Sequence, residues 1–194
     1  MGDLHEPWLI LEATPDDAEE YVACHVDCLA ETYVDIMPPA FAQLHRAEAP
    51  EKVRRLRREW RDGTLDSSWL ARDAAGEVVG IVQSGPGVQD WEAALDAPPT
   101  TVPHQLNHLY TRRRTFGTGL GRQLLEAALP DEATYLWILH DNARADAFYR
   151  RHGFVANGDE MNCGPSWFHR TMYRMVRPGL PAGTTPQPRP RSVA

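Results

Sequence analysis

The sequence has little of several features that would assign it to a specialised class of protein. No stretch approaches about 18 uninterrupted apolar residues, and the first eight residues lack the charged-then-apolar layout of a signal peptide. We therefore expect a cytoplasmic protein without a membrane span. Three cysteines, an odd number, fit reduced thiols better than a disulfide framework. Twenty Lys and Arg against 27 Asp and Glu give a net charge of -7, which argues against broad affinity for nucleic acid or an anionic membrane.

The chain has enough apolar residues for one core. Its 194 residues are 42% hydrophobic, which predicts a single globular domain over residues 1–177. Residues 178–194 contain five prolines and almost nothing apolar, so they cannot bury enough surface to offset the entropy of ordering. We expect this Pro-rich C-terminal tail to be disordered.

Hydrophobic periodicity predicts an alternation of strands and helices. A first helix begins after the N-cap Thr14 and ends before Met37, and a second runs from near Pro50 to Gly63. Further helices follow a glycine-rich stretch at 117–121 and run from Asn142 to about Arg151. Residues 85–103 are expected to form a long connection. Strands are predicted at 8–13, 68–72, 77–83, 104–111, 134–140, 154–158 and 169–176.

The stretch RTFGTGLGRQLLEAAL (114–129) places glycines at 117, 119 and 121 directly before a predicted helix. Unpaired N–H groups and the helix dipole make such a helix start suitable for phosphate, and glycines permit close backbone contact. Arg122 and Gln123 follow the last glycine, so neither the dinucleotide fingerprint nor the P-loop fits. By itself the stretch is equally consistent with a flexible surface turn.

A second motif decides between a phosphate site and a flexible turn. HDNARADAFYRRHGF (140–154) resembles the N-x-x-A-x-x-F-Y-x-x-x-G-F signature of the GNAT superfamily of N-acetyltransferases. It matches at Asn142, Ala145, Phe148, Tyr149, Gly153 and Phe154. LYTRRRTFGTGLGRQLL (109–125) resembles the acetyl-CoA pyrophosphate loop of that superfamily. The resemblance covers about residues 8–177 and implies an α/β fold in which helices flank a central mixed, mostly antiparallel sheet.

The resemblance implies acetyl-CoA as the cofactor, with coenzyme A as product, and a set of site residues. Tyr149 would protonate the departing thiolate, although a core aromatic is its simpler role. Asn142 would cap its helix and lie beside the pantetheine arm. A strand N–H near Leu109 or Tyr110 would stabilise the oxyanion. The full set of expected cofactor-binding residues is Leu109, Tyr110, Thr111, Arg114, Gly117, Thr118, Gly119, Leu120, Gly121, Arg122, Asn142 and Tyr149.

Three positions depart from the family pattern. Phe116 stands at a Gln or Arg position of the loop, Arg113 stands at a proline, and Gln105 stands where many members carry a glutamate as general base. A glutamine cannot accept a proton. Strand alternation points His104 and His108 away from the face of Gln105 unless a bulge intervenes, in which case His108 is a candidate catalytic residue beside Gln105.

The acceptor is the least determined part of the prediction. Either it is a low-pKa amine, or a water held by Gln105 and Asn107 deprotonates it. Acidic side chains before Met37 and around residues 89–95 are candidates to attract a cationic acceptor, although exposed acids are often simply solvated. The expected substrate-binding residues are Glu31, Tyr33, Asp35, Gln105 and Asn107.

The sequence thus predicts an N-acetyltransferase that moves acetyl from acetyl-CoA to a primary amine, either a small molecule or a peptide or protein N-terminus. The alternative is a catalytically degenerate acyl-CoA-binding sensor or interaction module. No metal site is expected, because Cys24 and Cys28 lack a second nearby ligand pair. The basic segment 52–61 is interpreted as a solvated helix face rather than a nucleic-acid site. A homodimer is left open.

Overall fold

A computed structural model describes residues 8–63 and 67–179 of the chain. One seven-stranded sheet forms its centre, in the order β1-β2-β3-β4-β5-β7-β6. The strands are β1 (Trp8–Glu12), β2 (Ser68–Asp73), β3 (Val78–Pro86), β4 (His104–Thr111), β5 (Thr134–Leu139), β6 (Val155–Asn162) and β7 (Thr171–Arg177). The helices are α1 (Ala18–Tyr33), α2 (Pro39–Asp62), α3 (Asp90–Ala94), α4 (Leu120–Ala128) and α5 (Ala143–Arg151), with short 3₁₀ turns η1 (Pro15–Asp17), η2 (Arg113–Thr115) and η3 (Pro165–Trp167).

One pairing in the sheet differs from the rest. All neighbouring strands run antiparallel except β4 and β5, which are parallel. These two strands pair only at their beginnings, through His104 with Thr134 and Gln105 with Tyr135. Beyond these pairs β4 has no strand partner on its β5 side among the residues that the structure describes. The sheet therefore opens in the middle, between the residues that follow Gln105 and Tyr135.

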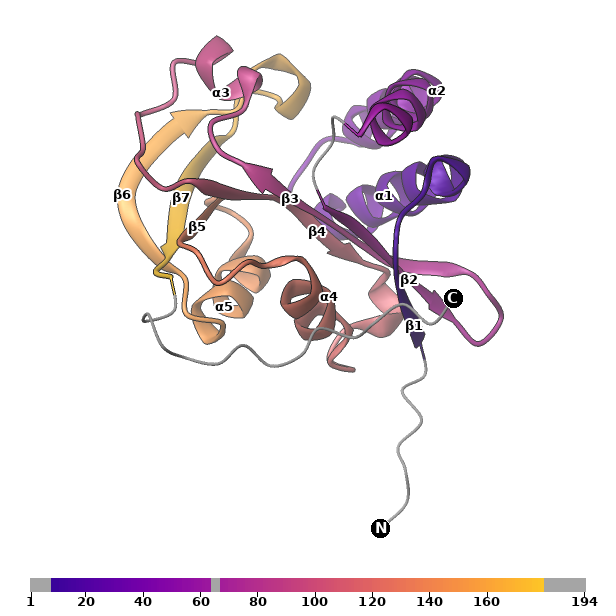
Figure 1. Ribbon diagram of the computed structural model, residues 1–194. Coiled ribbons are helices and arrows are strands. Elements are labelled where there is room, and N and C mark those ends of the chain that lie inside the picture. The colour runs from indigo at the N-terminus through magenta and orange to yellow at the C-terminus, as the bar shows by residue number, and fades with distance from the viewer. Residues whose placement is uncertain (1–7, 64–66, 180–194) are drawn as a thin grey trace.

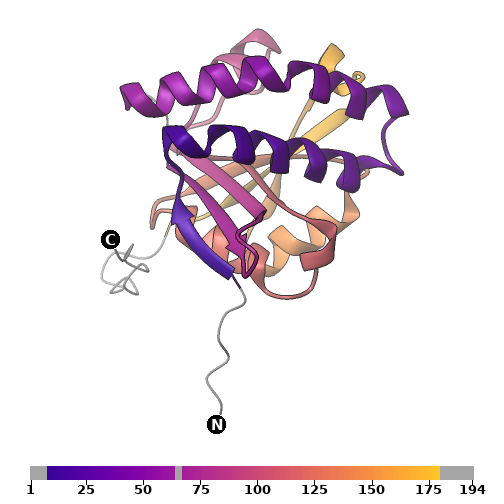
Figure 2. The ribbon, with the colours of Figure 1, turned by 90° about the vertical axis from the view of Figure 1, so that its right-hand side faces the viewer.

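The helices divide between the two faces of the sheet (Figures 1 and 2). α1 and α2 lie side by side on one face, where Tyr21, Val22, Val26 and Leu56 pack against Leu70 and Ile81. α4 and α5 cover the other face, where Leu120, Leu124, Tyr149 and Phe154 pack against Val79, Val82 and Leu106. A third apolar cluster joins the end of α1 to α2, β7 and η3. The predicted α/β fold, with a mostly antiparallel sheet flanked by helices, is confirmed.

The second helix begins earlier than the sequence predicts. α2 starts at Pro39, after an N-cap at Pro38, and continues through Pro50 to Asp62. Pro50 removes one backbone N–H, but it is exposed, so water can reach the carbonyl that loses its donor. Residues 40–49 are rich in strong helix formers such as Ala, Leu, Gln and Glu, which outweigh the single proline. The prediction that this helix begins near Pro50 was wrong by more than ten residues.

Most other elements follow the predicted pattern. Thr14 and Asp17 form the predicted cap before α1, with the Asp17 carboxylate accepting from the Thr14 backbone N–H at 2.9 Å. The hairpin β2-β3, strand β4 and helix α5 occupy the predicted segments. β6 runs four residues beyond the predicted end at 158, through an irregular register between Ala156 and Glu160. The predicted disordered tail lies outside the described residues from position 180 onward.

Candidate active site

A cavity of about 1000 Å³ lies over the opening between β4 and β5. Its walls come from α1, α2, the segment 86–95, β4, β5, α5 and η3. Residues from both faces of the sheet contribute, since His25 and Tyr33 belong to α1 whereas Ala145 and Tyr149 belong to α5 and Asn142 is its N-cap. The opening in the sheet therefore joins the α1 side to the α5 side, so that two molecules can meet there from opposite faces.

A bulge in β4 sets which side chains face α1. Gln83 of β3 pairs with His108, but the next residue, Ser84, pairs with Leu106, so Asn107 is an extra residue in β4. Leu106 packs with α4, whereas His108 packs with Tyr21 and His25 of α1. The bulge thus brings Gln105 and His108 into the same cavity. The sequence analysis expected His108 beside Gln105 only if such a bulge interrupts the strand.

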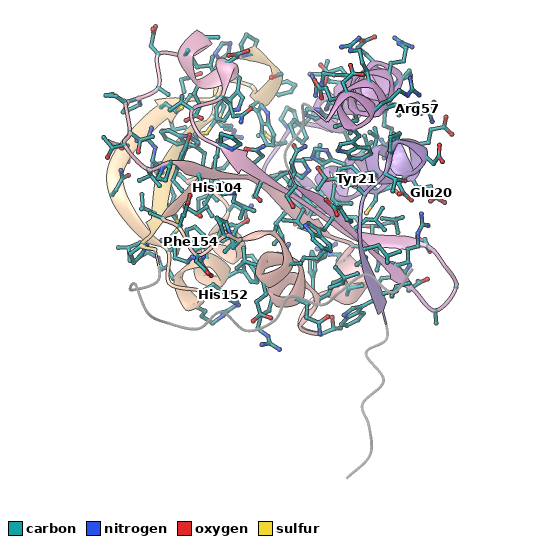
Figure 3. The ribbon with its side chains drawn as sticks, in the orientation of Figure 1. Glu20, Tyr21, Arg57, His104, His152 and Phe154 are labelled. Carbon is teal, nitrogen blue, oxygen red and sulfur yellow. The ribbon has the colours of Figure 1, made fainter. Side chains whose placement is uncertain are left out.

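His108 is held by α1 in a defined tautomer. The Tyr21 hydroxyl lies 3.1 Å from the carbonyl oxygen of Val82 and 2.9 Å from His108 Nε2. A carbonyl can only accept, so the Tyr21 proton goes to Val82 and the hydroxyl oxygen accepts from His108 Nε2–H. This leaves Nδ1 of His108 unprotonated. Figure 3 shows Tyr21 between α1 and the sheet.

Burial keeps this histidine neutral. Desolvation, followed by the positive charge of Lys52, lowers the pKa of His108 to about 3. His25 stacks on the His108 ring with centroids 4.6 Å apart, and burial together with His108 lowers the pKa of His25 well below its ordinary value. Both imidazoles are therefore neutral at physiological pH. Sequence analysis did not single out Tyr21 or His25 for this role, although their i, i+4 spacing on α1 places them on one helix face.

Tyr149 approaches the cavity from α5. It is 7% exposed, and burial, with a smaller contribution from Tyr33, raises its pKa above the ordinary tyrosine value. The Tyr33 hydroxyl lies 3.2 Å from the Tyr110 hydroxyl, so two predicted residues are in contact. The Asn142 side chain accepts from Ala145 N–H at 3.1 Å, which confirms its predicted capping of α5. Leu109, like these residues, lines the cavity.

The glycine-rich loop has the backbone that a phosphate site requires. Gly117 and Gly119 have φ of +77° and +94°, conformations that side chains disfavour, and no atom lies within 4 Å of a Cβ built on either. Position 121 favours glycine for a different reason, because a Cβ built there would lie 3.3 Å from the Phe148 ring. Thr118 binds back to the Thr115 carbonyl oxygen through its hydroxyl at 2.6 Å. Leu120 is buried at the start of α4, and Arg122 on the outside of the helix pairs with Glu126 at 3.1 Å.

The arginines before this loop are engaged with carboxylates. Arg112 contacts Glu31 at 2.9 Å, and a carboxylate oxygen of Glu31 also accepts from the Arg113 backbone N–H at 2.6 Å. Arg114 binds Asp73 and Glu77 of the β2-β3 hairpin at 2.9 and 2.8 Å. Glu31 therefore fixes the approach to the loop and does not line the cavity. Thr111, at the end of β4, pairs with Gly80 of β3, and its methyl group lies on the same side of the sheet as Leu120 and Leu124 of α4.

The other predicted acceptor residues divide into two groups. Tyr33, Gln105 and Asn107 line the cavity, and Gln105 Oε1 and Asn107 Oδ1 are buried without a hydrogen-bond partner in the described part of the chain. Asp35 is exposed in the α1-α2 connection, away from the cavity walls. His104 points to the side opposite Gln105, where its Nε2 is also buried without a partner within the described ranges.

No group of three or more His, Cys, Asp or Glu side chains in residues 8–63 and 67–179 is arranged to hold a metal ion. Cys24 Sγ lies 3.9 Å from Cys28 Sγ, and both thiols are buried and free. None of the helices that the structure describes is long and apolar enough to cross a membrane.

Comparison with protein families identifies the domain. Residues 65–156 match the model of the acetyltransferase (GNAT) domain, a segment that contains β4, the glycine-rich loop and α5. The match assigns residues 65–156 to the acetyltransferase (GNAT) domain, and the described residues share the fold of solved acetyltransferases. No curated protein matches the sequence.

Several solved structures have the same fold. PaiA N-acetyltransferase from Thermoplasma acidophilum, in complex with coenzyme A, is 15% identical with a TM-score of 0.61 over 88% of this chain and 98% of its own. A histone acetyltransferase HPA2 and related acetyltransferase from Corynebacterium glutamicum is 24% identical with a TM-score of 0.59, covering 91% and 99%. Ard1 from Thermoplasma volcanium is 20% identical with a TM-score of 0.59, covering 90% and 99%. These similarities show the fold.

Proposed function

We propose that the protein is an N-acetyltransferase that transfers acetyl from acetyl-CoA to a primary amine in a ternary complex. The observation that carries the proposal is that His108 and Tyr149 line one cavity, from the α1 and α5 sides of the opening between β4 and β5. Direct transfer needs a proton acceptor near the amine and a proton donor near the sulfur, in one continuous space.

The residues of the loop and of α4 fit coenzyme A. In the described residues no backbone acceptor is paired with the N–H groups of Gly117, Gly119, Leu120 and Gly121, which surround the start of a nine-residue helix. Such N–H groups and the helix dipole bind phosphate oxygens. A relative with this fold holds coenzyme A, which supports the same ligand here. When bound, acetyl-CoA supplies the thioester whose acetyl group is transferred.

The proposed proton movements use the protein's own side chains. His108 Nδ1, left unprotonated by the contact with Tyr21, accepts a proton from the attacking nitrogen, directly or through a water held by Gln105 and Asn107. Tyr149 keeps its proton at neutral pH because burial raises its pKa, and donates it to the thiolate. An N–H on the unpaired edge of β4, at Leu109 or Tyr110, would stabilise the oxyanion.

The low pKa of His108 restricts the acceptor. An imidazole with a pKa of about 3 is too weak to remove a proton from a free ammonium group. It can accept a proton only after the nitrogen has attacked, when that nitrogen is far more acidic. The acceptor must therefore enter as a neutral amine, which costs about 1 kcal/mol at pH 7 for an α-amine and about 4.6 kcal/mol for a lysine-like amine. This favours a low-pKa amine, in a small molecule or at a peptide N-terminus.

The test is coenzyme A release from acetyl-CoA in the presence of a panel of primary amines. We expect turnover by the parent protein, and Tyr149→Phe should lower kcat roughly a hundredfold while the dissociation constant for acetyl-CoA stays the same. His152→Asn is the control, since His152 is at the end of α5 on the outer side of the helix layer (Figure 3) and does not line the cavity. Binding of acetyl-CoA without turnover of any amine would contradict the enzyme and favour the sensor module.

A further inference from the structure

One wall of the cavity carries a stripe of charged and imidazole side chains that the proton transfers do not use. His45, Lys52, Arg55 and Glu59 of α2 line the cavity, and their spacings of seven, three and four residues place them on one helix face. Lys52 is the single lysine of the sequence, and its side chain is only 20% exposed. Placing it in a cavity wall rather than in solvent needs an explanation, because an ammonium group is strongly hydrated.

Lys52 and His45 together present hydrogen-bond donors. Lys52 Nζ lies 3.1 Å from His45 Nδ1, and an ammonium group can only donate, so Nδ1 accepts and the imidazole proton is on Nε2. His45 is 4% exposed, and Nε2 has no partner in the described part of the chain. A buried N–H donor without an acceptor costs free energy unless a ligand supplies one. The pair therefore offers one unused imidazole N–H next to a positive charge.

Each cation of this stripe has one acidic neighbour. Glu48 Oε2 lies 3.4 Å from both Lys52 Nζ and His45 Nδ1, from outside the cavity, and Glu59 lies 3.8 Å from Arg55. Of the acids that the sequence analysis considered for a cationic acceptor, Glu31 binds Arg112, and Glu92 is buried as the acceptor for Tyr135 and Trp137. Asp90 lines the opposite wall, in the segment 86–95. The α2 wall thus pairs each cation with an acid, and what it offers an anion is the Lys52 ammonium beside the His45 Nε2–H, which has no partner within the described residues.

Lys52 lines the same cavity as the proposed reaction site. Its charge contributes to the lowered pKa of both His25 and His108, so it acts on the same space. Gln105 Oε1 and Asn107 Oδ1, which have no partners within the described residues, supply acceptors for the N–H groups of an amine near His108. The cavity therefore has donors at the α2 wall and acceptors at the β4 bulge.

We propose that the acceptor is an amine that also carries an oxyanion, a carboxylate or a phosphate, and that Lys52 and His45 bind this oxyanion while the amine lies at the β4 bulge. The inference rests on the proposed function, since it names the class of acceptor for that reaction. An amino acid is the simplest molecule with this arrangement, and an aminoalkyl phosphate has the same chemistry.

The test compares matched acceptors that differ in the anionic group. Common amino acids are assayed beside their primary amides, and phosphoethanolamine beside ethanolamine, at equal concentrations of neutral amine so that differences in amine pKa do not enter. We expect kcat/KM to be higher by about tenfold or more for the anionic members, with the better of the two classes showing whether a carboxylate or a phosphate is preferred. Lys52→Met should raise KM for these members by about tenfold and leave KM for acetyl-CoA unchanged, and Lys52→Arg should retain most of the preference.

Arg58→Met is the matched control, because it removes one charge from an exposed position on another face of α2. Calorimetric titration of the same compounds into the coenzyme A complex gives a second readout that does not need turnover. If no amine is turned over, the proposed function fails, but binding of the anionic compounds that Lys52→Met abolishes would still support the anion site. The proposed anion site would be overturned if the amides and ethanolamine were used or bound as well as their anionic counterparts. An unchanged KM and affinity for the anionic compounds in Lys52→Met would also overturn it.

Discussion

The half-buried imidazole of His108 predicts that acid destabilises the protein in a defined pH range. Its pKa is about 3 in the folded protein against 6.5 for an unperturbed histidine, because burial disfavours the charged form. Between these two values the unfolded chain binds more protons than the folded one, so the free energy of unfolding rises with pH. The stability that the neutral imidazole contributes is therefore present above about pH 6.5 and is lost progressively as pH falls toward 3.

The magnitude at pH 5 follows from the two pKa values. The unfolded histidine is almost fully protonated there and the folded one is not, which corresponds to a loss of about 2 kcal/mol relative to pH 7. For a domain of this size, 1 kcal/mol shifts Tm by roughly 2 to 4 °C. The His108 contribution to the fall in Tm should then be about 4 to 8 °C.

The assay is urea unfolding at pH 7 and pH 5 for the parent protein and for His108→Gln, whose side chain does not titrate. Burial lowers the pKa of His25, His45 and His104 as well, so both proteins should lose stability on acidification. The parent should lose about 2 kcal/mol more than the variant. An equal loss in the two proteins would mean that His108 is protonated in the folded state or reaches water freely, and the account of the buried neutral imidazole would be refuted.

Three further predictions address the site. Gly119→Val should abolish the rise in Tm that acetyl-CoA causes, because its φ of +94° and the approach to the loop both require glycine; an unchanged rise in a thermal-shift titration would contradict this. Tyr21→Phe should lower kcat about tenfold with little change in KM, since His108 loses the partner that fixes its tautomer; steady-state kinetics with unchanged kcat would remove Tyr21 from the site. Glu92→Leu should cost about 3 kcal/mol or more in urea unfolding, because the buried donors of Tyr135 and Trp137 lose their acceptor, whereas Glu92→Gln should cost less.

Local patterns in the sequence are sufficient for most of the fold. The apolar spacing of α1, the turn residues of the β2-β3 hairpin and the cap at Asn142 each act within a few residues, so periodicity and capping rules find them. The start of α2 was wrong because one proline was given more weight than ten helix-forming residues before it. The extension of β6 depends on pairing with β7, which is a long-range contact that no local pattern contains.

The two halves of the candidate site differ in how far the sequence predicts them. The glycine-rich loop and Tyr149 are part of continuous motifs, so their positions could be predicted. The α1 side could not be predicted in the same way, because His25, His45 and Lys52 come from two helices and meet only when these pack on the sheet. The bulge at Asn107 reverses the strand alternation at His108, and a sequence shows such an irregularity only as an alternative to regular pairing.

The glutamine at position 105 and the Lys52–His45 pair on α2 have a common physical consequence. Gln105 brings no negative charge that would stabilise an ammonium group, and the burial that keeps His25 and His108 neutral disfavours a charged amine in the same space. The site thus favours an acceptor that has an oxyanion for the α2 wall and a neutral amine for the β4 bulge. An amine with a separate oxyanion has both, because its anion binds beside Lys52 while its amine, already neutral, enters the bulge. An alkylamine of high pKa without an anion has no group for the α2 wall and is charged at neutral pH, so it should be the poorest acceptor even if it fits the cavity.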